Sequence, residues 1–259
     1  MIRTAVIPAG GYGSRMEPIT RAVPKPMLAV IRKPAIHYVV QEAVDSGIRH
    51  VVIVTGFRSK VIEDYFSNEA EYDKRSYGPG NYFDGIDIEF ISQTKPKGLA
   101  DAILCAEGSI DGSAFAVLLA DDIIRSDVPA TMQLCNGYGN THTVGGLNIP
   151  ADELKNYGVL IPEADENIFG VLKIVEKPST NIAAGIAVAG RYILKKTIFD
   201  PLRKAYSERG TDSNITDALN IELASGHQIM GLKIDGRRFD IGNEEGYKKT
   251  ILAAIEENW

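Results

Sequence analysis

A glycine run followed by two basic residues lies near the start of the chain. Residues 8–15 read PAGGYGSR, and Lys25 follows between two prolines. Glycines after an apolar segment let backbone N–H groups turn outward and bind an anion, although such a run alone is often only a tight turn. Arg15 and Lys25 add the fixed cations that a triphosphate requires, and the prolines stiffen the backbone around Lys25. The pattern predicts a triphosphate site, lined by Ala9, Gly10, Gly11 and Gly13.

Two common nucleotide-binding patterns do not fit this segment. A dinucleotide fingerprint needs glycine at position 16, where Met16 stands, and an acidic residue after the next strand, where the chain has Thr55 and Gly56. A P-loop needs a lysine followed by serine or threonine directly after the glycines, and that sequence does not occur. The residues therefore disfavour NAD binding and the P-loop class of NTPases.

Two aspartates could hold a metal ion beside the triphosphate. Asp121 follows the apolar segment 114–120, and Asp240 directly precedes Ile241 and Gly242. Each aspartate alone is more often a helix cap or a turn former. Together, two carboxylates from distant segments can bind one Mg²⁺, with phosphate oxygens and water completing an octahedral shell. From the residues alone, both interpretations of the two aspartates stay open.

Strand and helix patterns alternate along the first part of the chain. Apolar segments predict buried strands at 4–9, 50–55 and 114–120, and an alternating pattern predicts a strand at 86–92. Helical periodicity appears at 36–44, 60–66 and 99–107. Strands separated by helices imply right-handed crossovers and a mainly parallel sheet. Open α/β sheets bind ligands at the carboxyl ends of their strands, which is where Asp121 lies.

The pattern changes after about residue 129. Short strands are predicted at 144–147, 159–161, 171–176, 186–193 and 228–234, with fewer helices between them than before. Helices are expected at 215–224 and 245–257. This part is expected to add antiparallel or mixed strands and a small lobe over the carboxyl edge of the sheet. Residues 72–85, rich in Gly, Tyr and Asp, are the best candidate for a mobile loop.

Composition excludes several classes of protein. The 259 residues are 44% hydrophobic and carry a net charge of −6, so a general nucleic-acid-binding role is disfavoured. The two cysteines, Cys105 and Cys135, are too far apart for a CxxC pair. No apolar stretch reaches the length of a membrane span, and the first residues lack a signal-peptide pattern. We expect a cytoplasmic protein with small-molecule substrates and no membrane partner; whether it forms a homo-oligomer is left open.

Residues 8–28, PAGGYGSRMEPITRAVPKPML, resemble the signature of sugar-1-phosphate nucleotidyltransferases. The resemblance continues through PKGLADAI, VLLADDI, NYGVL, VEKP, AVAGRYIL, TDALN and RFDIGNEEGY. The whole series is most similar to bacterial and archaeal UTP–glucose-1-phosphate uridylyltransferases. It implies one Rossmann-like three-layer domain over 1–259 with a mainly parallel mixed sheet. The nucleotide-binding part is expected at about 1–130 and the sugar-phosphate-binding part at about 131–259.

The resemblance also implies roles for single residues on the nucleotide side. Arg15 and Lys25 would hold the triphosphate, and Asp121 and Asp240 would bind the metal ion. At the base, Gln93 would read a pyrimidine edge while Gly98 leaves room for the ring. Asp122 is expected to tune or cap this site rather than to bind the metal.

On the sugar side, the resemblance implies that Glu176 binds sugar hydroxyls and that Lys177 binds the sugar phosphate. Tyr157 and Gly158 match a turn that approaches the hexose in the family. The reaction implied is an in-line attack of the sugar phosphate on the α-phosphorus of UTP, which releases pyrophosphate. No general base is needed, because a phosphate monoester is already ionised.

The chain departs from the uridylyltransferase pattern at two places. Pro26 stands where an acidic residue is usual, and Ala184-Gly185 replaces a Ser-Asn pair. The segment Pro18-Ile19-Thr20 is also similar to thymidylyltransferases. The alternatives are therefore dTTP with glucose 1-phosphate or GTP with mannose 1-phosphate. A protein that only binds sugar nucleotides is disfavoured, since the predicted phosphate-binding and metal-binding residues are all retained.

Overall fold

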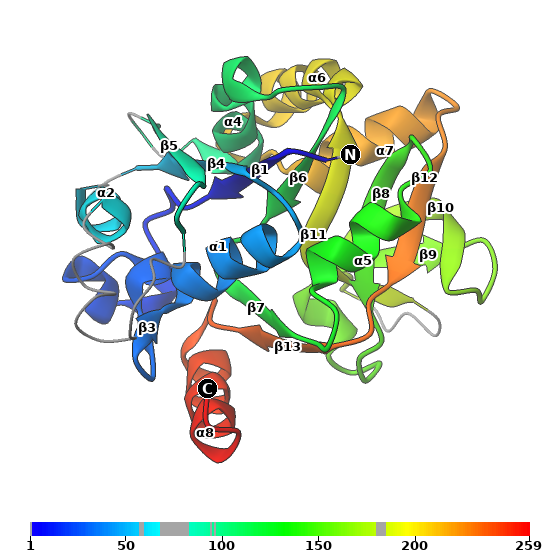
Figure 1. The fold of residues 1–259 in the computed structure, drawn as a ribbon. Helices are drawn as coiled ribbons and strands as arrows, with labels where there is room; N and C mark the ends of the chain where they lie inside the picture. Colours follow the sequence, from blue (N-terminus) through cyan, green and yellow to red (C-terminus); the bar gives the residue numbers. More distant parts are fainter. Residues whose placement is uncertain (1, 57–59, 68–82, 94, 96, 180–184) are drawn as a thin grey trace.

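A nine-stranded sheet runs through the computed structural model, which describes residues 2–56, 60–67, 83–93, 95, 97–179 and 185–259 (Figure 1). The strand order is β5-β4-β1-β6-β11-β8-β12-β10-β9. Only β10 and β11 run against the other seven strands of this sheet. The prediction of a mainly parallel, mixed sheet is confirmed.

Four parallel strands form one half of the sheet: β5 (Asp87–Ser92), β4 (His50–Thr55), β1 (Thr4–Pro8) and β6 (Ala114–Leu118). These strands are rich in Val, Ile and Ala and are buried on both faces of β1, β4 and β6, as expected of a sheet covered on both sides. Their carboxyl ends lie at one edge. The glycine loop, Gln93 and Asp121 follow three of these ends and so gather at that edge.

The second half of the sheet contains both parallel and antiparallel neighbours. Its strands are β8 (His142–Leu147), β9 (Gly158–Pro162), β10 (Ile168–Glu176), β11 (Ile186–Lys195) and β12 (Ile229–Lys233). The long, fully buried part of β11 joins the two halves, because it pairs with β6 on one side and β8 on the other. A single sheet thus connects the glycine loop to the predicted sugar-binding residues.

Helices cover both faces of the sheet, which gives three layers (Figure 1). One face packs against α1 (Ala35–Asp45), α2 (Lys60–Ser67) and α5 (Ala130–Gly137). The other packs against α4 (Gly98–Cys105), α6 (Phe199–Arg209) and α7 (Ile215–Ala224). Strand β1 shows the alternation clearly, since Ala5 and Ile7 join the first core and Val6 joins the second. Among the described helices, each is too short or too polar to span a membrane.

A two-stranded antiparallel ribbon crosses the lower part of the molecule in Figure 1. Its strands are β7 (Asp122–Arg125) and β13 (Arg237–Asp240), and their register pairs Asp122 with Asp240. A smaller ribbon, β2 (Ala29–Val30) with β3 (Lys33–Pro34), lies near the start of α1. Helix α8 (Glu244–Glu256) extends from the body at the chain's end (Figure 1). The β7–β13 ribbon therefore brings two distant aspartates together.

Most predicted elements are present, with ends shifted by a few residues. The sequence analysis missed the ribbon strands and helices α5 and α6. Helix α6 is highly charged, and only its Phe199, Leu202 and Ala205 face the core strongly, so its apolar stripe is narrow. The predicted mobile loop at 72–85 lies largely outside the described residues.

Candidate active site

Two adjacent cavities at the carboxyl edge of the sheet contain every residue that the sequence predicted for the site. The nucleotide-side cavity has a volume of about 310 Å³ and the sugar-side cavity about 550 Å³. The first is lined by Ala9, Gly10, Gly11, Gly13, Lys25, Gln93, Gly98 and Asp121. The second is lined by Arg15, Asp121, Tyr157, Gly158, Glu176, Lys177 and Asp240. Asp121 belongs to both walls, so it marks the point where the cavities meet.

Gln93 is held in one orientation at the nucleotide-side cavity. It follows β5, and its side chain is almost completely buried. Its Nε2 donates to Asp101 Oδ2 at 2.6 Å and, more weakly, to the Gly98 carbonyl at 3.5 Å. Its Oε1 lies on the other side, 3.1 Å from the position that a Cβ at Gly10 would take. Gln93 thus offers an acceptor, not a donor, beside the glycine loop.

Gly98, the first residue of α4, is required by the backbone as much as by the cavity. Its φ of 91° lies in the left-handed region, and a Cβ there would overlap the carbonyl oxygen of Thr211. Thr211 lines the sugar-side cavity. The prediction that Gly98 leaves room for a base stays a prediction, and the structure adds a second reason for glycine.

Lys25 and Asp121 form an ion pair at the junction of the cavities. Lys25 begins the short 3-10 helix Lys25–Met27, which places its Nζ against Asp121 Oδ2. Burial acts to raise the pKa of Asp121, but Lys25 and Arg238 together hold that pKa below its ordinary value. The carboxylate is therefore ionised near neutral pH, and a cation is already in place for an incoming phosphate.

Asp121 and Asp240 converge on a space that Gly242 leaves open. A Cβ at Gly242 would lie 2.6 Å from Asp240 Oδ1 and 3.5 Å from Asp121 Oδ2. The backbone N–H of Ile241 also donates to the carbonyl of Asp121 at 3.0 Å, which fixes the two segments relative to one another. Two carboxylates with open space between them fit a Mg²⁺ ion whose remaining ligands are phosphate oxygens and water.

Asp122 lies opposite Asp240 in the β7–β13 ribbon and pairs with Arg238. The guanidinium Nε and Nη2 donate to the two carboxylate oxygens of Asp122 at 2.7 and 2.8 Å. Arg238 also lies over the ring of Tyr157, with its Cζ 4.1 Å from the ring centroid. Because burial and the neighbouring carboxylates favour protonation, the pKa of Asp122 is raised to about 7 against the opposing effect of Arg238. Asp122 thus forms part of the sugar-side wall; that it tunes the site stays a prediction.

A second buried ion pair, between Arg191 and Glu42, adjoins Asp122. Arg191, which is fully buried, donates to both carboxylate oxygens of Glu42 at 2.7–2.9 Å and to the carbonyl of Asp122 at 2.7 Å. Thr131 also donates its hydroxyl and N–H to Glu42. The hydrogen bonds of Arg191 therefore connect strand β11, helix α1 and strand β7 next to Asp121 and Asp122.

Lys177 holds an unusual backbone conformation at the sugar-side cavity. Its φ of 42° lies in the left-handed region, which costs a non-glycine residue roughly 1–2 kcal/mol. Its N–H donates to the Tyr157 carbonyl at 3.0 Å. Beside it, Glu176 accepts a hydrogen bond from the Thr216 hydroxyl at 3.2 Å. Strain of this kind at a charged residue in a cavity is typical of a functional position.

The sequence analysis missed residues that orient the predicted ones. Arg238 holds Asp122 and Tyr157, Asp101 holds Gln93, and Thr216 holds Glu176. All three lie inside motifs that carry the resemblance. For Arg238 a signal existed, because it precedes Asp240 by two residues on one strand and so points to the same face.

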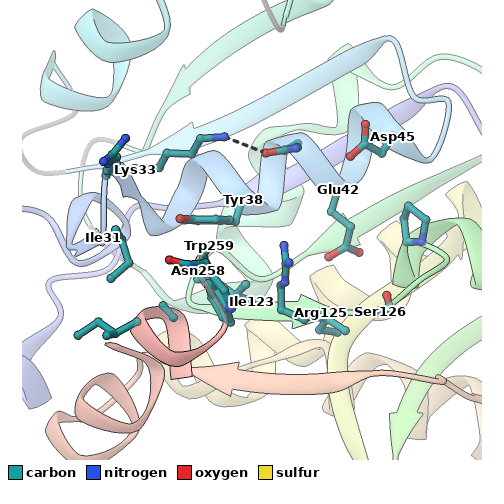
Figure 2. A pocket seen from close by; sticks show the side chains of 16 residues that line it. Ile31, Lys33, Tyr38, Glu42, Asp45, Ile123, Arg125, Ser126, Asn258 and Trp259 are labelled. Carbon is teal, nitrogen blue, oxygen red and sulfur yellow. Dashed lines mark hydrogen bonds between the residues drawn. The ribbon is translucent and has the colours of Figure 1, made fainter. Parts of the chain in front are cut away.

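A larger cavity of about 810 Å³ lies away from these residues, between α1, the β7–β13 ribbon and the end of α8 (Figure 2). Tyr38, Glu42, Arg125 and Trp259 line it, and Arg125 lies over the Trp259 ring at 5.1 Å. It contains none of the predicted site residues. Size alone therefore does not identify the active site; the converging carboxylates and cations do.

An α/β sheet with a glycine loop, a buried amide and paired aspartates at its carboxyl edge is typical of a nucleotidyltransferase class of enzyme. A family model described as nucleotidyl transferase matches residues 4–257. The chain therefore belongs to the nucleotidyl transferase family.

Individual relatives extend this result. The chain is 38% identical to a UTP–glucose-1-phosphate uridylyltransferase of Staphylococcus saprophyticus, over 100% of this chain and 94% of that protein. It is 39% identical to a UTP–glucose-1-phosphate uridylyltransferase of Bacillus subtilis, over 96% of this chain and 88% of that protein. A crystal structure of UDP-glucose pyrophosphorylase complexed with UDP-glucose superposes with a TM-score of 0.89 at 33% identity, covering 99% of this chain and 100% of that one.

Proposed function

We propose that this chain transfers UMP from UTP to glucose 1-phosphate, forming UDP-glucose and pyrophosphate. The observation that carries the proposal is the meeting of the two cavities at Asp121. One cavity has the features of a pyrimidine nucleotide site, and the other has the charges of a sugar-phosphate site. Relatives of nearly equal length are named for this reaction.

The main obstacle to this reaction is repulsion between anions. At an effective dielectric constant of about 20, two unit charges ~4 Å apart repel by roughly 4 kcal/mol. We assign Arg15 and Lys25 to the triphosphate. We assign Lys177, which lines the sugar-side cavity together with Glu176, to the sugar phosphate. Positioning and charge neutralisation by these groups supply the catalysis, since the attacking phosphate is already ionised.

The metal ion proposed for the site is Mg²⁺, held by Asp121 and Asp240. When bound, it would neutralise phosphate charge and orient the triphosphate. Lys25 pairs with Asp121 in the structure. In the proposed reaction, the Lys25 ammonium group turns from that carboxylate to a phosphate oxygen when the substrates bind. We assign the binding of the glucose hydroxyls to Glu176 and to the turn at Tyr157 and Gly158.

The donor base is proposed to be uracil. The Oε1 of Gln93 can accept the ring N–H that uracil and thymine carry and that cytosine lacks. Together with the names of the relatives, this favours UTP, and dTTP is the nearest alternative because thymine has the same pairing edge.

Labelled UTP tests the reaction. With UTP labelled in the α-phosphate and glucose 1-phosphate as acceptor, the label is expected in UDP-glucose. With UTP labelled in the γ-phosphate, it is expected in pyrophosphate. Label from the γ-phosphate in inorganic phosphate would instead indicate hydrolysis and would contradict the proposal.

A further inference from the structure

Asp101 faces Gln93 from the first turn of α4 and controls what that amide presents to the cavity. A carboxylate has only acceptor oxygens, so the group that faces it at 2.6 Å must be the Gln93 Nε2. The Gly98 carbonyl, also an acceptor, lies on the same side. A rotated amide would place its own oxygen against both acceptors, which is unfavourable in a buried position.

We propose that Asp101 is a specificity-determining residue: it locks the Gln93 amide so that Oε1 faces the base, and thereby selects UTP over CTP. This inference rests on the proposed function. Asp101 does not line the cavity, whereas Gln93 does, so it acts through Gln93 and is a positioning residue.

The chemistry of the two pyrimidines explains the selection. At the ring nitrogen of the pairing edge, uracil has an N–H donor and cytosine has a lone pair. Oε1 accepts from the first and is repelled by the second. The same buried amide would suit cytosine if its NH₂ group faced the cavity, and the two acceptors behind Gln93 oppose that rotation.

Asp101→Asn is the direct test. The asparagine amide can donate to Gln93, which permits the rotated state, so the selectivity for UTP over CTP is expected to fall by about 10-fold or more. The assay mixes UTP and CTP at equal concentration with glucose 1-phosphate and measures the ratio of UDP-glucose to CDP-glucose. Asp87→Asn is the matched control, since it makes the same change on β5 at a carboxylate that is 78% exposed; its product ratio should equal that of the unmodified enzyme.

Two further variants separate positioning from folding. Asp101→Glu keeps an acceptor and is expected to retain more selectivity than Asp101→Asn, while Asp101→Ala should lose selectivity as Asp101→Asn does. If the Asn or Ala variant loses rate on both triphosphates but keeps the product ratio, the inference is wrong. If the unmodified enzyme makes no UDP-glucose, the proposed function fails instead, and the two failures are thus distinguished.

Discussion

The two cavities bind their substrates by different means. The nucleotide-side cavity is built mainly from backbone and small residues that follow β1 and β6 or lie in α4, with Lys25, Gln93 and Asp121 as its polar side chains. The sugar-side cavity is built from charged side chains that come from β7, β10, β13 and the short segment at Arg15. Much of the backbone-lined site comes from short continuous segments, such as residues 8–11 and 119–121. A site of charged side chains depends on the packing of distant segments.

The strongest test of this difference is at the junction. Asp121→Asn and Asp240→Asn each remove a proposed metal ligand, so we expect rate losses of about 100-fold or more for each. Initial rates over a range of Mg²⁺ concentration, with circular dichroism as a check of folding, measure the effect. Near-normal rates at limiting Mg²⁺ in both variants would show that the metal site lies elsewhere.

Substitutions of two basic residues in the sugar-side cavity should separate the two substrates. Lys177→Ala is expected to raise KM for glucose 1-phosphate by about 10-fold or more, while Arg15→Ala should mainly impair the use of UTP and the chemical step. Steady-state kinetics with each substrate varied in turn provides the test. Arg15 lines the sugar-side cavity, so this pair is informative. The opposite pattern would mean that the two basic residues have exchanged roles.

The buried charges behind the site should matter for stability more than for selectivity. Arg191→Met leaves the Glu42 carboxylate buried without its cation, and the loss of one partner of such a pair typically costs about 3–5 kcal/mol. Urea unfolding is expected to show a loss of that size. The double variant Arg191→Met with Glu42→Gln should recover part of it. Equal losses in the single and double variants would indicate that the pair does not act as a unit.

The smallest effect concerns whether the two halves of the sheet unfold together. His142 begins β8; its Nδ1 accepts the N–H of Lys195 at 3.2 Å, and burial lowers its pKa from 6.5 to about 4. The unfolded chain therefore binds the proton first, so stability is lost as pH falls from about 6.5 towards 4. Between pH 7 and 5 this protonation lowers the free energy of unfolding by about 2 kcal/mol. The His142→Gln variant should lack this part of the pH dependence.

Urea unfolding at both pH values measures this contribution. Because one sheet joins the halves, a single transition is expected in each case. Two separate transitions, with only one of them sensitive to pH, would show that the halves are independent units. An unchanged pH dependence in His142→Gln would assign the effect to other groups.

The sequence predicted the first half of the fold more completely than the second. Strands such as residues 50–55 are largely apolar and are followed by glycine or an acidic residue, so their bounds and their common edge followed from local pattern. The ribbon β7–β13 could not be predicted in this way. Its strands are short and charged, and they are 112 positions apart counted from Arg125 to Arg237.

In the candidate site, too, local motifs predicted some residues, whereas the roles of others depend on tertiary packing. All predicted site residues line the two cavities. They could be predicted because each belongs to a motif that is continuous in sequence. Asp101, Arg191 and Arg238 were not assigned roles, since their partners lie on other elements. Such contacts depend on tertiary packing and have no local signature.

A competition among nucleotides tests the central claim most directly. UTP, dTTP, CTP, ATP and GTP at equal concentration are mixed with glucose 1-phosphate and Mg²⁺, and the nucleotide sugars formed are separated and quantified. The account predicts UDP-glucose as the main product, measurable dTDP-glucose and little CDP-glucose, because the Gln93 Oε1 can accept the ring N–H that uracil and thymine carry and that cytosine lacks. A purine nucleotide sugar as the main product would contradict the account.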